Sequence, residues 1–84
     1  MQFKNDTDLY LVIGANIKHY RKQAKLTQVQ LAERSHISIS YLSKIEATGC
    51  SKNISISVLN QIANVLDVEI YEFFKEVSYH GTNN

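Results

Sequence analysis

The amino-acid sequence predicts an all-α fold with about five helices. Three observations lead to this fold class: apolar residues recur at spacings of three and four, one helix-start signature occurs three times, and the chain contains no proline. Eighty-four residues suffice for one domain with a modest core. We therefore expect a single domain over residues 1–77, followed by a disordered tail over residues 78–84.

The first helix is expected to begin near Thr7 or Asp8, because either side chain can cap the amide groups of a first turn. Its apolar face follows helical spacing: Ile13, Ile17, Tyr20 and Ala24. Basic residues fall largely on its other faces: Lys18, Arg21, Lys22 and Lys25.

The next three helices are each predicted from a capping Ser or Thr that stands between two apolar residues. The apolar pairs are Leu26 and Leu31, Ile37 and Leu42, and Ile54 and Leu59; the caps are Thr27, Ser38 and Ser55. Gln30 completes a capping box with Thr27. The repeated Ile-Ser-Ile-Ser alternation is too short to indicate a strand. A fifth helix is expected near Glu69, and a longer loop from Thr48 to Asn53.

Charge is distributed unevenly along the chain, although the net charge is only +1. Residues 14–53 contain seven Lys and Arg residues and two Glu residues, so this part is basic and can attract phosphate. Chance segregation in a small domain is the alternative explanation. No apolar run is long enough to cross a bilayer, no signal-peptide pattern is present, and the single Cys50 is compatible with the cytoplasm.

Residues 28–47 have the spacing of two helices joined by a tight turn. Leu31, Ala32, Ile37, Leu42 and Ile45 are expected to face the shared core. The second of these helices then presents a polar outer face, with these residues on it or at its tip: Ser38, Ile39, Ser40, Ser43 and Lys44. A helix held in this way can enter the major groove of DNA.

These features together resemble the Cro/repressor helix-turn-helix family, also called the xenobiotic-response-element family. The matching residues are Ile13-Gly14, Ile17, Tyr20-Arg21, Leu26-Thr27-Gln28, Leu31-Ala32, Ile37-Ser38, Tyr41 to Glu46, Leu59, Ile62-Ala63, Leu66, Val68 and Phe73-Phe74. The resemblance implies a five-helix lambda-repressor-like domain without cofactor or metal. It also implies a cytoplasmic transcriptional regulator, most simply a repressor, that binds double-stranded DNA at a roughly palindromic operator as a homodimer.

The resemblance also implies roles for individual residues. Gln28 would bind a phosphate and brace the recognition helix. Ser38, Ile39, Ser40 and Lys44 would meet base edges, with Lys44 donating to guanine and Ile39 touching a thymine methyl. Tyr41 and Ser43 would contact phosphate or sugar, and Lys52 would reach the DNA backbone from the loop. Arg21 and Glu46 would form a structural ion pair between the first and third helices.

Several of these residues have a simpler explanation that the sequence leaves open. Ile39 and Tyr41 can belong to the core, Gln28 can be an ordinary first-turn residue, Lys44 can be a solvated charge, and Ser38 is expected to cap a helix in any case. The chain also departs from the family in three places. In the turn, His36 stands where glycine is usual and Ser35 where a small apolar residue is common. The loop that contains Lys52 is longer than usual, and Ile54 stands where many relatives have proline.

The C-terminal segment is rich in large apolar residues, of which Tyr71, Phe74 and Val77 are expected to form a dimer interface. The alternative is that they complete the core of a monomer. Catalysis is not expected, because the three histidines and Cys50 show no metal-binding or nucleophile pattern. The competing function is a protein-interaction module of the same fold, such as an antitoxin or a bridging factor.

Overall fold

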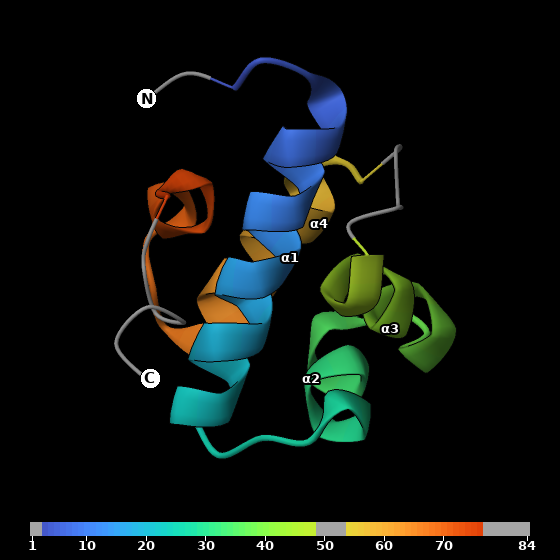
Figure 1. Cartoon of the computed structure of the whole chain (residues 1–84). Coiled ribbons are helices and arrows are strands. Elements are labelled where there is room, and N and C mark those ends of the chain that lie inside the picture. Colours follow the sequence, from blue (N-terminus) through green and yellow to red (C-terminus); the bar gives the residue numbers. More distant parts are fainter. Residues whose placement is uncertain (1–2, 49–53, 77–84) are drawn as a thin grey trace.

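The computed structural model describes residues 3–48 and 54–76, and these residues form helices joined by short connections (Figure 1). The elements are α1 (Asp6–Gln23), α2 (Gln28–Ser35), α3 (Ile39–Thr48), α4 (Ile56–Leu66) and the short 3-10 helix η1 (Ile70–Phe74). The all-α prediction is confirmed. The short fifth helix expected near Glu69 is a five-residue 3-10 helix with Glu69 at its N-cap, so the structure has four α-helices in the described residues.

The start of α1 also differs from the prediction. Asn5 is the N-cap: its backbone is extended, and its Oδ1 accepts a hydrogen bond from the amide of Asp8 at 2.9 Å. Thr7 and Asp8 therefore lie inside the first turn instead of capping it. The acidic groups of Asp6 and Asp8 interact favourably with the positive end of the helix dipole, which explains the earlier start.

The other three helix starts are as predicted. Thr27 and Gln30 form a reciprocal capping box, with hydrogen bonds of 3.1 and 2.9 Å between side chain and backbone amide. The hydroxyls of Ser38 and Ser55 each accept a hydrogen bond from the amide three residues later, at 3.0 Å. Each of these bonds satisfies an amide that has no partner within its own helix.

Three helices are followed within two residues of their end by a residue with a left-handed backbone, and none of these residues is glycine. Lys25, His36 and Asp67 have φ values of 60°, 62° and 58°. His36 is the residue that stands in place of the family's usual glycine, in the turn between α2 and α3. Histidine and aspartate adopt this conformation more readily than most residues do.

α1 is the central element of the fold and contacts α3, α4 and η1 (Figure 1). The core side chains are almost fully buried: Ile13, Ile17, Leu31, Ala32, Leu42, Ile45, Leu59, Ile62, Ala63, Leu66 and Phe73. Ile37, in the turn between α2 and α3, packs against this core while partly buried. The predicted apolar stripes of α2, α3 and α4 thus meet Ile13, Ile17 and Tyr20 of α1 in one cluster, whereas Ala24 is exposed at the C-cap of α1 and is not part of it.

Gly14 allows α1 to approach α3 closely. A Cβ atom at this position would collide with the backbone carbonyl oxygen of Ile45. A rigid backbone cannot move aside as the end of a flexible side chain would, so residue 14 has to lack a side chain here. This contact brings the backbone of α1 against the last turns of α3.

Asn16 fastens the C-terminal segment to α1, a role that the sequence analysis missed. Its fully buried amide donates hydrogen bonds to the carbonyl oxygens of Phe73 and Lys75, both at 2.9 Å. Nearby, the hydroxyl of Tyr20 donates to a carboxylate oxygen of Glu72 at 2.9 Å. The one signal in the sequence is a polar residue adjacent to Ile17 in the buried stripe of α1.

Ser35 is fully buried at the end of α2, and its hydroxyl has no hydrogen-bond partner in the described part of the chain. An unsatisfied buried hydroxyl is destabilising by about 1–3 kcal/mol. We therefore expect Ser35→Ala to raise the free energy of unfolding by about 1 kcal/mol, measured by urea denaturation.

Ser38→Ala provides the matched control, since the hydroxyl of Ser38 caps α3. This change should lower the free energy of unfolding by about 1 kcal/mol. If Ser35→Ala instead lowers stability by as much as Ser38→Ala does, the hydroxyl of Ser35 has a partner and the prediction is wrong.

Candidate nucleic-acid interface

The turn between α2 and α3 sets the direction of α3. The left-handed backbone of His36 ends α2, and the amide of Ile37 then donates to the carbonyl of Ala32 at 3.0 Å. Ser38 caps the next helix directly. Because His36, Ile37 and Ser38 each take part in a hydrogen bond, the turn sets the orientation of α3 against α2 (Figure 1).

The two sides of α3 differ as the sequence predicted. Leu42 and Ile45 are 0% and 2% exposed and face the core. Four residues are exposed on the outer side or at the tip: Ser38, Ile39, Ser40 and Lys44. Ile39 is 44% exposed and is not part of the buried core, so of its two explanations the outward one fits the geometry.

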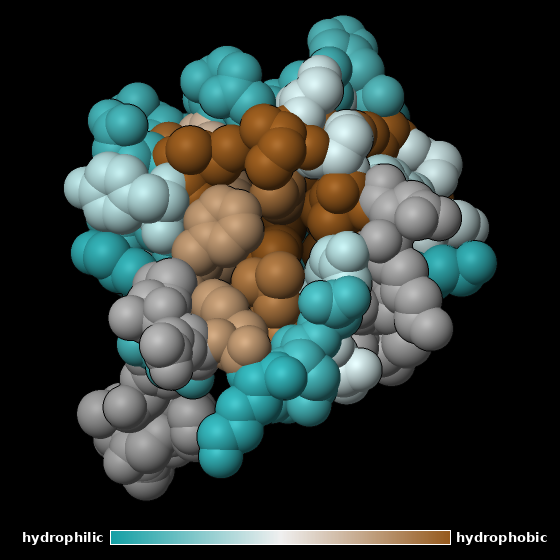
Figure 2. All heavy atoms as spheres, turned by 90° about the horizontal axis from the view of Figure 1, so that it is seen from above, coloured by the Kyte–Doolittle hydropathy of each residue, from teal (hydrophilic) through white to brown (hydrophobic). Residues whose placement is uncertain are grey.

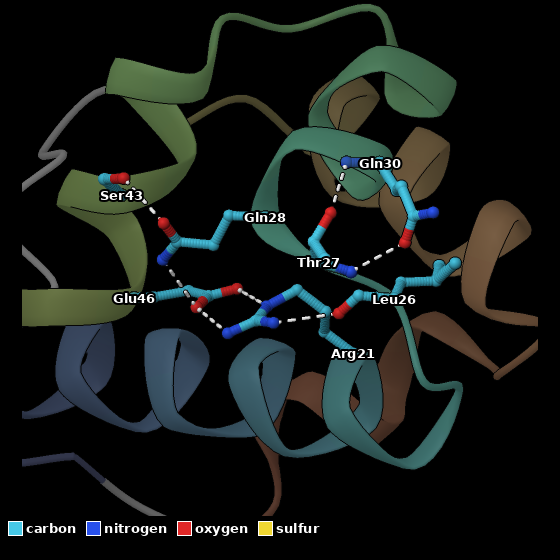
Figure 3. Close-up of polar contacts among 7 residues, drawn as sticks. All are labelled: Arg21, Leu26, Thr27, Gln28, Gln30, Ser43 and Glu46. Carbon is cyan, nitrogen blue, oxygen red and sulfur yellow. Dashed lines mark hydrogen bonds and ion pairs between the residues drawn. The ribbon is translucent and has the colours of Figure 1, made fainter.

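Tyr41 and Ser43 are half-buried and are placed differently. Tyr41 packs against the core cluster, so part of its ring is used for packing. The hydroxyl of Ser43 points toward α2 and donates to Oε1 of Gln28 at 2.9 Å (Figure 3). Gln28 therefore braces α3 through Ser43, while it remains partly accessible at the start of α2.

An ion pair joins α1 to α3 behind this face (Figure 3). Arg21 donates from Nε and Nη2 to the two carboxylate oxygens of Glu46, at 2.8 and 2.9 Å. Its Nη1 donates to the carbonyl of Leu26 at 2.9 Å, and Nε2 of Gln28 donates to Glu46 at 3.0 Å. A continuous polar chain thus runs from α1 through Glu46 and Gln28 to Ser43.

Both members of the pair are largely removed from solvent. The side chains of Arg21 and Glu46 are 11% and 2% exposed. Buried charges are stable only when they are paired and hydrogen-bonded, and here both oxygens of the carboxylate and all three nitrogens of the guanidinium are engaged. The pair holds the C-terminal part of α3 at one position against α1.

Two of the expected site residues lie outside the described residues. Lys52 falls in the loop between α3 and α4, and Val77 follows the last described residue. The same holds for the expected tail over residues 78–84. The expected interface residues Tyr71 and Phe74 are described: Tyr71 is 55% exposed, whereas Phe74 is half-buried against the core.

A surface rich in apolar side chains covers the end of the molecule where α1 begins (Figure 2). A groove on this side is lined by Phe3, Lys4, Asp8, Leu11, Val12 and Glu76. Leu11 is 46% exposed here, whereas the other large apolar residues of α1 are at least partly buried.

None of the helices in the described ranges is long and apolar enough to span a membrane. Among the described residues, no three His, Cys, Asp or Glu side chains lie close enough together to hold a metal ion.

Comparison with known proteins agrees with this geometry. A family model described as helix-turn-helix matches residues 17–73, and the chain belongs to this family, in its Cro/repressor type. The chain is 43% identical over 60 residues to the immunity repressor protein of Bacillus phage phi105, a match that covers 71% of this chain and 40% of the relative. It is 38% identical over 65 residues to the HTH-type transcriptional regulator SinR of Bacillus subtilis (strain 168), covering 77% and 58%.

The fold is also similar to solved structures. A crystal structure of the biofilm regulator SinR in complex with DNA matches with a TM-score of 0.70 and 38% identity, over 75% of this chain and 98% of that chain. The chain thus spans about half the length of the curated relatives, and nearly all of the SinR chain in that DNA complex.

The ion pair provides a test of how α3 is held. Glu46→Gln leaves the buried Arg21 guanidinium without a counter-charge, so we expect the free energy of unfolding to fall by about 3–5 kcal/mol. Thermal and urea denaturation measure the change. The control is Glu33→Gln on the exposed side of α2, which should change stability by less than about 0.5 kcal/mol. Equal stability of the two variants would show that the pair does not hold α3.

Proposed function

We propose that this chain is a transcriptional regulator that binds double-stranded DNA with sequence specificity, most simply as a repressor. The observation that carries the proposal is the outer face of α3. It is polar and exposed, while its inner face is fixed by the core and by the Arg21–Glu46 pair. A rigid helix with exposed polar side chains on one side fits the major groove.

The residues of this face favour a particular kind of readout. The ammonium group of Lys44 can donate to O6 or N7 of guanine, and the exposed side chain of Ile39 suits the methyl group of thymine. The hydroxyls of Ser38 and Ser40 can form hydrogen bonds to base edges or to phosphates. Tyr41 and Ser43 are placed to contact the sugar-phosphate backbone. Lys52 would add a backbone contact from the following loop.

We also propose the bounds of the domain, the compartment in which it acts and its independence of cofactors. Residues 1–77 form the DNA-binding domain, with η1 in the place of a fifth helix, and residues 78–84 form a tail. The protein acts in the cytoplasm and uses neither a cofactor nor a metal. Its relatives are regulators and not enzymes, and we propose no catalytic role.

Lys44→Ala tests specific readout. Loss of one base contact should weaken binding to the preferred duplex by about 1–3 kcal/mol and relax the preference at one base pair. The preferred duplex is first selected from a random DNA pool, and affinities are then measured by fluorescence anisotropy.

Gln61→Glu is the control, because it lowers the net charge by the same one unit at an exposed position of α4. It should leave the base preference unchanged. Should the unmodified protein bind all duplexes equally, with no effect of Lys44→Ala, the specific readout is wrong and the protein-interaction module becomes the better explanation.

We further propose that two copies associate through the apolar end shown in Figure 2, with Tyr71, Phe74 and Val77 in the interface. The exposed ring of Tyr71 supports this proposal, and so does the neighbouring groove, which carries both Lys4 and Glu76. A two-fold axis would set these opposite charges against each other across the interface. The dimer would present its recognition helices about 34 Å apart to a roughly palindromic operator.

Tyr71→Glu tests the dimer, because it places a charge in the proposed interface. Sedimentation velocity at micromolar concentration should show a dimer for the unmodified protein and a monomer for the variant. Val29→Glu is the control: Val29 is 48% exposed on α2, so it is equally accessible but lies outside the proposed interface. A monomer in all three samples would contradict the dimer, both in the absence and in the presence of DNA.

A further inference from the structure

Three lysines form a strip at the C-terminal end of α1 that none of the roles above uses. Lys18 and Lys22 are one turn apart on the helix, and Lys25 follows in the connection to α2. All three are exposed, and within the described parts of the chain their ammonium groups form no ion pair. We call them the α1 lysine strip.

The position of the strip follows from the contacts of α1 with α3. Gly14 and Arg21 both face α3, through Ile45 and Glu46 respectively. At about 100° per residue, Lys18 lies about 40° from Gly14 around the helix, on the side away from the buried Ile17. The strip therefore occupies the outer flank of α1, next to its junction with α3.

The far end of the strip reaches the start of α2. Arg21 donates to the carbonyl of Leu26, the residue that directly follows Lys25. Thr27 then caps α2, and Gln28 begins it. The strip thus ends close in sequence to the N-terminus of α2, whose dipole is positive at that end.

The positive charge of the strip is not balanced by acidic residues in this part of the chain. Between residues 14 and 48 the acidic residues are Glu33 and Glu46, and Glu46 is paired with Arg21. The outer face of α3 contributes a single cation, Lys44. Phosphate neutralisation supplies most non-specific and much specific affinity for DNA, so the recognition face needs further cations beside it.

We infer that the α1 lysine strip binds phosphates of the operator backbone that flank the bases read by α3. This inference rests on the proposed DNA-binding function and extends the contact surface from α3 onto α1. The strip contributes affinity that is independent of sequence, whereas Lys44 and Ile39 supply the preference for particular bases. A merely solvated face would contribute neither.

The test compares two double variants of equal charge in the full chain. The strip variant is Lys18→Ala with Lys22→Ala, and the control is Asn60→Asp with Gln61→Glu, which lowers the net charge by the same two units at exposed positions of α4. Binding to the selected operator and to an unrelated duplex of equal length is measured across a series of KCl concentrations. Circular dichroism and sedimentation confirm that fold and oligomeric state are kept.

The expected result is a loss of affinity that is equal for both duplexes, about tenfold or more at low salt. The slope of log K against log salt should become shallower by about 1.8, which corresponds to two phosphate contacts at about 0.9 each. The control should keep the slope of the unmodified protein.

Two results would overturn the inference while leaving the proposed function intact. One is a strip variant whose slope equals that of the control, which would make the strip a solvated face. The other is a loss confined to the selected operator at an unchanged slope, which would assign the lysines to base recognition. Failure of the unmodified protein to bind any duplex would instead remove the proposed function, and the inference with it.

Discussion

The ion pair between Arg21 and Glu46 fixes the angle between α1 and α3, and the geometry of the candidate interface depends on it. Its carboxylate receives hydrogen bonds from Arg21 and from Gln28, so one buried acidic group connects the first three helices. Such a pair adds little net stability, because desolvation offsets most of the attraction. Its main effect is geometric, since any other arrangement of these helices would leave a buried charge unpaired.

The same network determines what Gln28 can still do. Its Oε1 accepts from Ser43 and its Nε2 donates to Glu46, so the orientation of the amide is fixed by a donor on one side and an acceptor on the other. Nε2 has a second hydrogen, which can form a hydrogen bond to a phosphate oxygen. Bracing α3 and binding a phosphate are therefore compatible roles for this side chain.

Much of the fold follows from local sequence signals. The caps at Thr27, Ser38 and Ser55 were predictable because each depends on residues within four positions. The start of α1 at Asn5 was missed, because Asn5, Thr7 and Asp8 are all competent caps and local sequence does not rank them. Asn16 was missed for a different reason: its partners are 57 and 59 residues away, and backbone carbonyls leave no trace in a sequence.

For the candidate site, the sequence placed the polar side of α3 correctly but left Ile39 and Tyr41 undecided. The spacing of Ile39 from Leu42 suits the core, and its exposure results from where α1 and α2 lie, which a helix pattern cannot supply. Ser35 was noted as a departure from the family, yet only the structure shows that its hydroxyl is buried without a partner.

The attachment of the C-terminal segment through Asn16 has a consequence for spacing. α1 holds the C-terminal segment through Asn16 and holds α3 through Gly14 and Arg21, so both segments are attached to the same stretch of one helix. In a dimer joined through the C-terminal segment, the distance between the two copies of α3 would therefore depend on these contacts with α1, and not on the loops.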